Sequence, residues 1–213
     1  LAYGIASQLD DGLPAGMDVS TASFSVRDDY TTLAWLGGRA ALLELGRPQD
    51  AIGMFARYGD AAKSPQTKAK GYYWAARAAN AAGDRGTQAQ YLNKAAGFPD
   101  QYYGMLALED LGQPLPNFAA MPRPKGDANP AGRPLYMAAM NASSRAEQTT
   151  FVRAIGNGAK TEAEHLDAIA LAHMMGRPDL AVIAGRNARI EGFDTMIPLA
   201  FPTVAMPLGY ESN

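Results

Sequence analysis

The feature that most constrains this chain is a two-helix unit that recurs about every 38 residues. In each copy an aromatic residue leads the first helix, a glycine breaks it, and apolar residues lie on the second helix. A period of this size is typical of stacked helical hairpins, because one hairpin cannot bury its own apolar face. The defining residues are Trp35, Gly46-Arg47-Pro48, Ala51 and Phe55 in the first copy, and Tyr73, Trp74, Gly83-Asp84, Ala89 and Leu92 in the second.

Apolar spacing predicts helices along most of the chain, and no segment shows the sustained alternation of a strand. The first long helix should begin at Asp28-Asp29, where negative charge favours a helix start. Its buried stripe should comprise Leu33, Leu36, Ala40 and Leu43. Further helices are predicted over residues 48–60, 65–82, 87–96, 99–111, 135–140, 146–155, 161–175 and 178–191. The fold class is therefore all-α, with stacked antiparallel hairpins in a TPR-like α-superhelix.

Proline and glycine divide this array. Residues 1–112 should form the first part of the superhelix, and residues 113–134 a proline- and glycine-rich connection. Hairpins should continue over residues 135–192. From residue 193 onward Pro198, Pro202 and Pro207 predict an extended tail, residues 193–213.

Composition excludes several classes of protein. The net charge of -2 argues against binding nucleic acid by neutralising phosphates. The chain has no cysteine, which excludes disulfides and thiolate metal sites. No apolar run approaches the roughly 18 residues that a membrane span requires. The chain begins at Leu1 without a signal-peptide pattern, so we expect a processed product or a fragment.

Catalytic and metal-binding patterns are weak. The two histidines, His165 and His173, lie on one predicted helix, and His173 falls on its apolar stripe, where a hydrogen-bonded core histidine is the default expectation. Glu162 and His165 form a single Glu-x-x-His, whereas a bundle metal site needs two such motifs with further carboxylates. No nucleophile elbow or phosphate-binding glycine loop is present. The sequence therefore predicts no catalytic residue, metal or cofactor.

Aromatic and basic residues on the predicted helices offer a candidate contact surface. Adjacent aromatics on a helix point about 100° apart, so one ring can pack in the array while its neighbour faces a ligand. Together with nearby cations, such rings would suit a carbohydrate that carries carboxylates. The competing interpretation is that these rings pack between hairpins, which is the usual role of aromatic residues on helices. The candidate residues are Tyr72, Tyr102, Tyr103, Lys70 and Arg77.

Several of these residues belong to motifs that resemble a known family. The motifs are Lys70-Gly71-Tyr72-Tyr73-Trp74-Ala75-Ala76-Arg77-Ala78, Gly83-Asp84, Tyr102-Tyr103-Gly104-x-Leu106-Ala107 and Leu111-Gly112. In this order they resemble the α-superhelical region of the soluble lytic murein transglycosylases. Pro198-Leu199-Ala200-Phe201-Pro202 resembles the linker that follows it. The resemblance covers residues 28–112 and the tail from about 193, whereas residues 113–192 fit only as generic helices.

The resemblance implies a periplasmic protein of cell-wall turnover. Family members cleave glycan strands between N-acetylmuramic acid and N-acetylglucosamine, using one glutamate in a lysozyme-like domain with a Gly-Leu-Met-Gln motif. This sequence has no such motif, and we do not assign the role to Glu211. We therefore expect a non-catalytic scaffold that binds peptidoglycan glycan strands beside a lysozyme-like catalytic domain in cis. The alternative is a TPR-like adaptor that binds envelope proteins.

Overall fold

The computed structural model describes residues 2–118 and 133–201. Every regular element within these two ranges is helical, which confirms the all-α prediction. The helices form two compact units, Leu1–Pro116 and Asn117–Asn213. The division lies within the stretch 113–134, where prolines and glycines disfavour regular structure.

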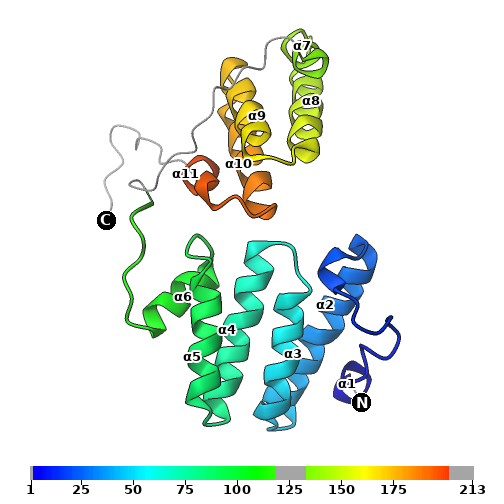
Figure 1. The fold of residues 1–213 in the computed structure, drawn as a ribbon, viewed down its shortest axis with the longest axis vertical. Helices are drawn as coiled ribbons and strands as arrows, with labels where there is room; N and C mark the ends of the chain where they lie inside the picture. Colours follow the sequence, from blue (N-terminus) through cyan, green and yellow to red (C-terminus); the bar gives the residue numbers. More distant parts are fainter. Residues whose placement is uncertain (1, 119–132, 202–213) are drawn as a thin grey trace. The chain divides into compact units, whose positions relative to one another are not determined.

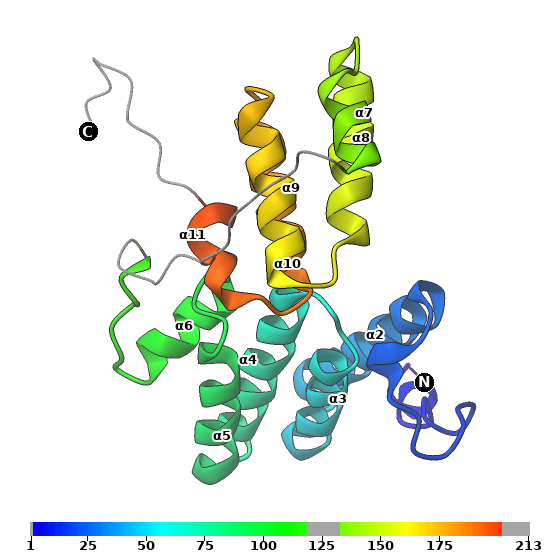
Figure 2. The same cartoon turned by 45° about the horizontal axis from the view of Figure 1, so that its top comes forward.

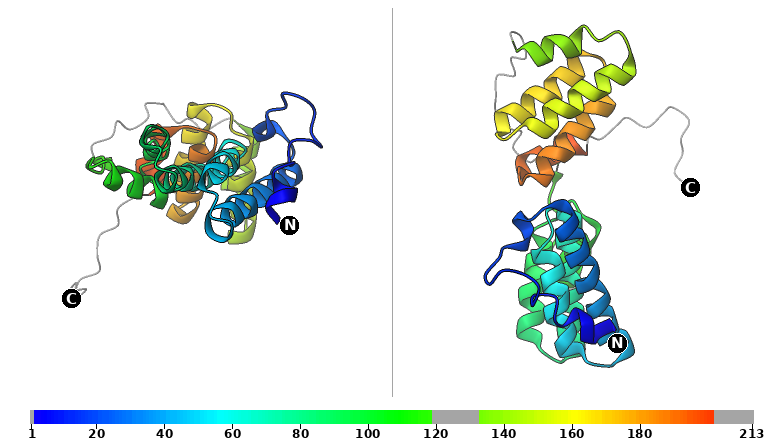
Figure 3. Two further views of the ribbon diagram at one scale, coloured as in Figure 1. Left: turned by 90° about the horizontal axis from the view of Figure 1, so that it is seen from below. Right: turned by 90° about the vertical axis from the view of Figure 1, so that its right-hand side faces the viewer.

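Consecutive helices of the first unit lie side by side, each packed on the next (Figure 1). Helix α4 contacts α3, α5 and α6, so it is the central helix of this unit. The N-terminal helix α1 lies against α2 (Figure 3). The elements are α1 (Ala2–Ala6), η1 (Val19–Thr21), α2 (Phe24–Arg39), the π-helical turn η2 (Ala40–Glu44), α3 (Pro48–Asp60), α4 (Pro65–Ala81), α5 (Arg85–Ala96) and α6 (Tyr102–Asp110).

Helix α2 begins one turn earlier than the sequence pattern predicted. The hydroxyl of Ser23 accepts a hydrogen bond from the backbone N–H of Val26, which satisfies one of the unpaired donors at the helix start. The expected start at Asp28-Asp29 is therefore wrong. Asp28 and Asp29 instead lie in the second turn of α2.

The predicted apolar stripe is wrong for its three leucines and right for Ala40, which is buried in η2. Leu33, Leu36 and Leu43 are exposed, and α2 instead packs through small residues, including Gly37 and Gly38. A Cβ atom on Gly38 would lie 2.7 Å from the ring of Phe55 on α3. The helix thus turns its smallest residues toward a large neighbour, as dense packing requires. Its leucines remain outside.

The hairpin repeat has a spacing of 37 residues. Gly46 and Gly83, which stand 37 apart, both end a helix with a positive φ. Phe55 and Leu92, at the same spacing, are both buried. Ala89, which a spacing of 38 would pair with the buried Ala51, is exposed. An error of one residue rotates a helical position by about 100°, enough to move it off the buried face.

Gly71 and Gly104, two glycines of the sequence motifs described above, permit close contact between backbones. A Cβ atom on Gly71 of α4 would lie 2.6 Å from the backbone nitrogen of Gly59 on α3. One on Gly104 of α6 would lie 1.9 Å from the carbonyl oxygen of Phe98. Since no side chain fits in either gap, both motif glycines have a packing role that is independent of any ligand.

The second unit is a smaller bundle. Helix α9 packs on α8 and α10, and α7 packs on α8 (Figure 2). Its core is centred on Val152, Leu171 and Leu180. The elements are α7 (Pro134–Met140), α8 (Arg145–Gly158), α9 (Glu162–Met174), α10 (Pro178–Ile190), η4 (Asp194–Met196) and α11 (Ile197–Ala200).

The start of the predicted extended tail is helical. Residues 194–200 form η4 and α11, and Met196 is fully buried in the core of the second unit. The extended prediction for this segment is wrong because Pro198 lies in the first turn of α11, where a helix tolerates proline. Pro202, Pro207 and the remainder of the tail lie outside the described residues.

A Gly-Arg-Pro sequence forms the same turn in both units. Gly46 and Gly176 have φ values of 62° and 66°, and proline opens the helix that follows each. In both turns the arginine reaches a preceding helix. Arg47 lies over the ring of Tyr3 on α1, at 4.8 Å from its centroid, whereas Arg177 contacts α8.

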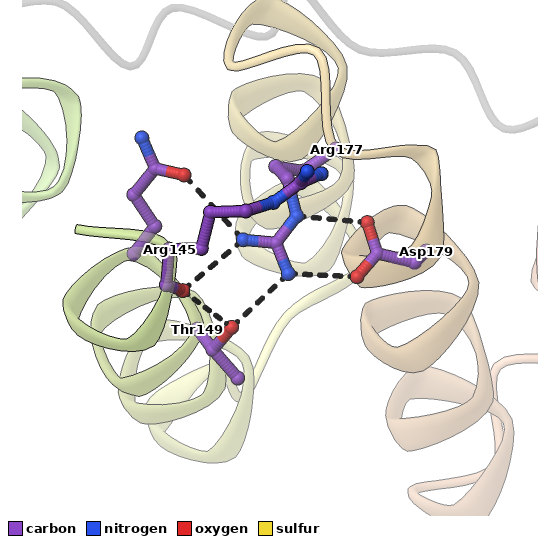
Figure 4. Close-up of polar contacts among 5 residues, drawn as sticks. Arg145, Thr149, Arg177 and Asp179 are labelled. Atoms are coloured by element: carbon purple, nitrogen blue, oxygen red, sulfur yellow. Dashed lines mark hydrogen bonds and ion pairs between the residues drawn. The ribbon is translucent and has the colours of Figure 1, made fainter.

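The buried Arg177 guanidinium, at the turn between α9 and α10, bonds residues of both α8 and α10 (Figure 4). It donates to both carboxylate oxygens of Asp179, at 2.9 and 2.7 Å, and this contact lowers the pKa of Asp179. It also donates to the carbonyl oxygen of Arg145 and the hydroxyl of Thr149, each at 3.1 Å. These bonds fix the turn between α9 and α10 to the first turns of α8.

One of the two histidines is buried, but it is His165 and not His173. His173 is exposed, so its predicted place in the core is wrong. His165 is fully buried and packs on the ring of Phe193, and neither of its ring nitrogens has a hydrogen-bond partner among the described residues. Burial lowers the pKa of His165 below its ordinary value of 6.5.

The close contact between α3 and α4 predicts the effect of two alanine substitutions. Gly71→Ala forces a Cβ atom against the backbone of α3, so we expect a loss of about 1–3 kcal/mol in the free energy of unfolding. Gly53→Ala, on α3, places its Cβ atom no closer than 3.7 Å to a flexible arginine side chain. This control should stabilise the chain by about 0.5–1 kcal/mol. Urea denaturation measures both, and equal stability of the two variants would contradict the packing role of Gly71.

Burial of His165 predicts that the second unit weakens in mild acid. The unfolded chain takes up the proton first, because the folded-state pKa is lowered, so stability is complete above pH 6.5 and falls as the pH drops below it. His165→Leu should remove this loss between about pH 7 and about pH 5.5, whereas His173→Gln should retain it. Amide hydrogen exchange in α9 and α10 measures the effect. A parallel loss in wild type and His165→Leu would assign it to other groups.

Candidate functional site

A group of aromatic rings surrounds one lysine where α2, α3 and α4 meet. It comprises Trp35 of α2, Tyr58 of α3, and Lys70 and Trp74 of α4, and we call it the tryptophan–lysine cluster. All four side chains are half-buried. Lys70 and Trp74 are one helical turn apart, so they share a face of α4.

The ammonium group of Lys70 lies over the indole of Trp35. Its Nζ atom is 3.5 Å from the centroid of that ring and 5.3 Å from that of Tyr58, both within the range of a cation–π contact. Trp74 meets Trp35 edge to face, with centroids 5.7 Å apart and planes at 87°. The neighbouring rings therefore fix the indole on which the lysine lies.

Two arginines flank the cluster. Arg39 follows Trp35 by one turn of α2, and Arg77 lies over Trp74, at 5.5 Å from its ring. In the portion of the chain that the structure describes, neither arginine nor Lys70 forms an ion pair. Burial lowers the pKa of Lys70, and the charge of Arg39 lowers it further. The surface thus presents three cations beside apolar rings, and none of the three forms an ion pair with a described carboxylate.

Tyr72, although adjacent to this cluster in sequence, lies elsewhere. Its ring stacks on Tyr91 and Phe98, with centroids 6.3 and 6.4 Å apart, and its hydroxyl donates to Asp60 at 2.8 Å. Burial and this hydrogen bond raise the pKa of Tyr72. Lys94 of α5 lies over the rings of Tyr72 and Tyr91, at 5.1 and 5.2 Å. Tyr72 therefore packs between helices.

The paired tyrosines of α6 occupy a third place. Tyr103 is half-buried and packs on Tyr73, whereas Tyr102 is exposed. Tyr102 lines an open, mainly apolar groove of about 370 Å³ together with Met105, Leu115 and other residues of α6 and the segment after it. Of the five candidate residues, the structure places only Lys70 and Arg77 on one surface.

Four members of that surface are not among the candidate residues from the sequence: Trp35, Tyr58, Trp74 and Arg39. A local signal existed for three of them, since Trp35 and Arg39 have the i, i+4 spacing that Lys70 and Trp74 also have. Tyr58 comes from another helix, and no local pattern relates it to Lys70. Its inclusion depends on how α3 packs between α2 and α4.

Other kinds of site find little support. Over residues 2–118 and 133–201, no three side chains of the histidine, aspartate and glutamate types gather to hold a metal ion. No helix in those ranges is long and apolar enough to cross a membrane.

Comparison with protein-family models, curated proteins and solved structures gives no match for this chain. Its function must therefore be argued from its own residues.

The environment of Lys70 predicts its reactivity. Because burial and Arg39 both lower its pKa, Lys70 should reach the neutral, nucleophilic amine at a lower pH than an ordinary lysine. Acylation by an amine-specific reagent over a pH series, read by peptide mass spectrometry, measures the pH midpoint at which each lysine becomes reactive. Arg39→Gln removes one of the two causes and should raise the midpoint of Lys70. An unchanged midpoint in that variant would contradict the contribution of Arg39.

Proposed function

We propose that this chain is a non-catalytic scaffold of a lytic transglycosylase and that it binds peptidoglycan glycan strands. The observation that carries the proposal is the tryptophan–lysine cluster, a surface of aromatic rings with cations at its centre and edges. Binding sites for small ligands and saccharides typically combine apolar ring faces with a few fixed polar groups. Glycan strands offer the apolar faces of sugar rings and, where the stem peptide has been removed, the lactyl carboxylate of muramic acid.

The arrangement of the first unit is compatible with such a scaffold. Its helices follow one another in a row, and the two motif glycines allow close packing. We propose that this row forms part of a TPR-like α-superhelix and that residues 135–192 form further hairpins of the same kind. The proposal places the protein in the periplasm. It further includes a lysozyme-like catalytic domain in cis, where the glycosidic bond between the two amino sugars would be cleaved.

A second candidate function is supported by the groove on α6. Its lining by Tyr102, Met105 and Leu115 is suited to an apolar segment of a protein partner. The chain would then be a TPR-like adaptor for envelope proteins. This function needs no contact at the tryptophan–lysine cluster, so the two candidates predict different sensitive residues.

Sedimentation with purified sacculi tests the main proposal. The chain should pellet with sacculi, and Lys70→Glu should weaken binding roughly tenfold or more by removing a charge-assisted contact and repelling acidic groups. Lys94→Glu makes the same change of charge at a lysine that lies over other rings, and it should bind like wild type.

Two outcomes would count against the proposal. If the chain stays in solution, or if Lys94→Glu loses as much binding as Lys70→Glu, the cluster does not hold glycan. Saturable binding of an envelope protein that Met105→Glu abolishes, with no sedimentation on sacculi, would instead support the adaptor.

A further inference from the structure

The position of Lys70 blocks the surface that a sugar would use. Its ammonium lies 3.5 Å from the centre of the Trp35 ring, closer than any other cation–π contact among the described residues. A sugar that stacked on this side of the indole would have to occupy the same space. Lys70 must therefore leave the indole of Trp35 before a sugar can stack on this face.

Displacing Lys70 from Trp35 gives up an attraction worth roughly 2- to 30-fold in an equilibrium constant. A neutral sugar offers no charge in return. A carboxylate does, because a charge-assisted hydrogen bond to an ammonium is about twice as strong as a neutral one. Arg39 and Arg77 bring additional positive charge to the same surface, and neither forms an ion pair with a described carboxylate.

We infer that Lys70 determines specificity, and that it admits sugar strands bearing carboxylates while excluding neutral ones. In the free protein the ammonium covers Trp35. When an acidic strand binds, the ammonium moves to the carboxylate, and the exposed indole face receives the sugar ring. No covalent bond changes in this exchange. The inference rests on the proposed function, since it names the chemical class of glycan that the same surface binds.

Intrinsic fluorescence can follow the exchange. The chain has two tryptophans, Trp35 and Trp74, and both belong to the cluster. One probe is glycan strand released from its peptides by an amidase, which leaves a carboxylate on each muramic acid. The other probe is chitohexaose, a neutral chain of N-acetylglucosamine. Wild type should bind the acidic strand and bind chitohexaose weakly or not at all.

Lys70→Ala should reverse this preference. Loss of the ammonium should weaken binding of the acidic strand about tenfold or more. Exposure of the ring should strengthen binding of chitohexaose roughly 2- to 30-fold. Alanine is the best helix former, so the variant should remain folded, which circular dichroism can verify. Lys94→Ala should keep the wild-type preference, and Lys70→Arg should restore binding of the acidic strand.

The outcomes separate this inference from the proposed function. If wild type binds both probes equally, or if Lys70→Ala keeps the wild-type preference, Lys70 is not the specificity residue, although the chain still binds glycan. If wild type binds neither probe, glycan binding itself is wrong, and the inference is wrong with it. A reversal in Lys70→Ala alone supports both.

Discussion

The close contact between α3 and α4 at Gly59 and Gly71 is the constraint on which the first unit depends. A Cβ atom at Gly71 would meet the α3 backbone at 2.6 Å, so the two helices can approach this closely only through glycine. That approach places Phe55 of α3 within 5.7 Å of Trp74 on α4, measured between ring centroids. The aromatic core and the surface above it therefore both follow from one backbone contact.

The same packing explains why a cation lies on the surface without a carboxylate partner. Helices that meet through alanine and glycine leave room for a few large rings between them, and these rings reach the surface at Trp35 and Trp74. Lys70 covers one of the rings instead of pairing with an acid. An ammonium in this position is stabilised by the ring quadrupole, and the ring carries no opposite net charge that would neutralise it. It can exchange the ring for an anion, and this property connects the fold to the proposed binding of acidic glycan.

Local signals in the sequence predicted the all-α class and most helix ends, because glycine stops and proline starts act within a single turn. They failed where a choice depended on distant residues. Leu33 and Leu36 have ideal helical spacing, yet α2 packs through Gly37 and Gly38 because Phe55 fills the space there. At the site, the sequence indicated Lys70 and Arg77 but could not relate Lys70 to Trp35, which lies on another helix. Such pairings arise only from tertiary packing.

The most direct test of this account is a two-dimensional nitrogen–proton spectrum recorded as amidase-released glycan strands are added. The two indole N–H signals, from Trp35 and Trp74, report on the cluster alone. Both should shift in a saturable manner, together with backbone signals of α2 and α4 around Lys70, while signals around Tyr102 stay in place. Saturable shifts confined to α6, with both indole signals unchanged, would show that the cluster is not where the chain binds glycan.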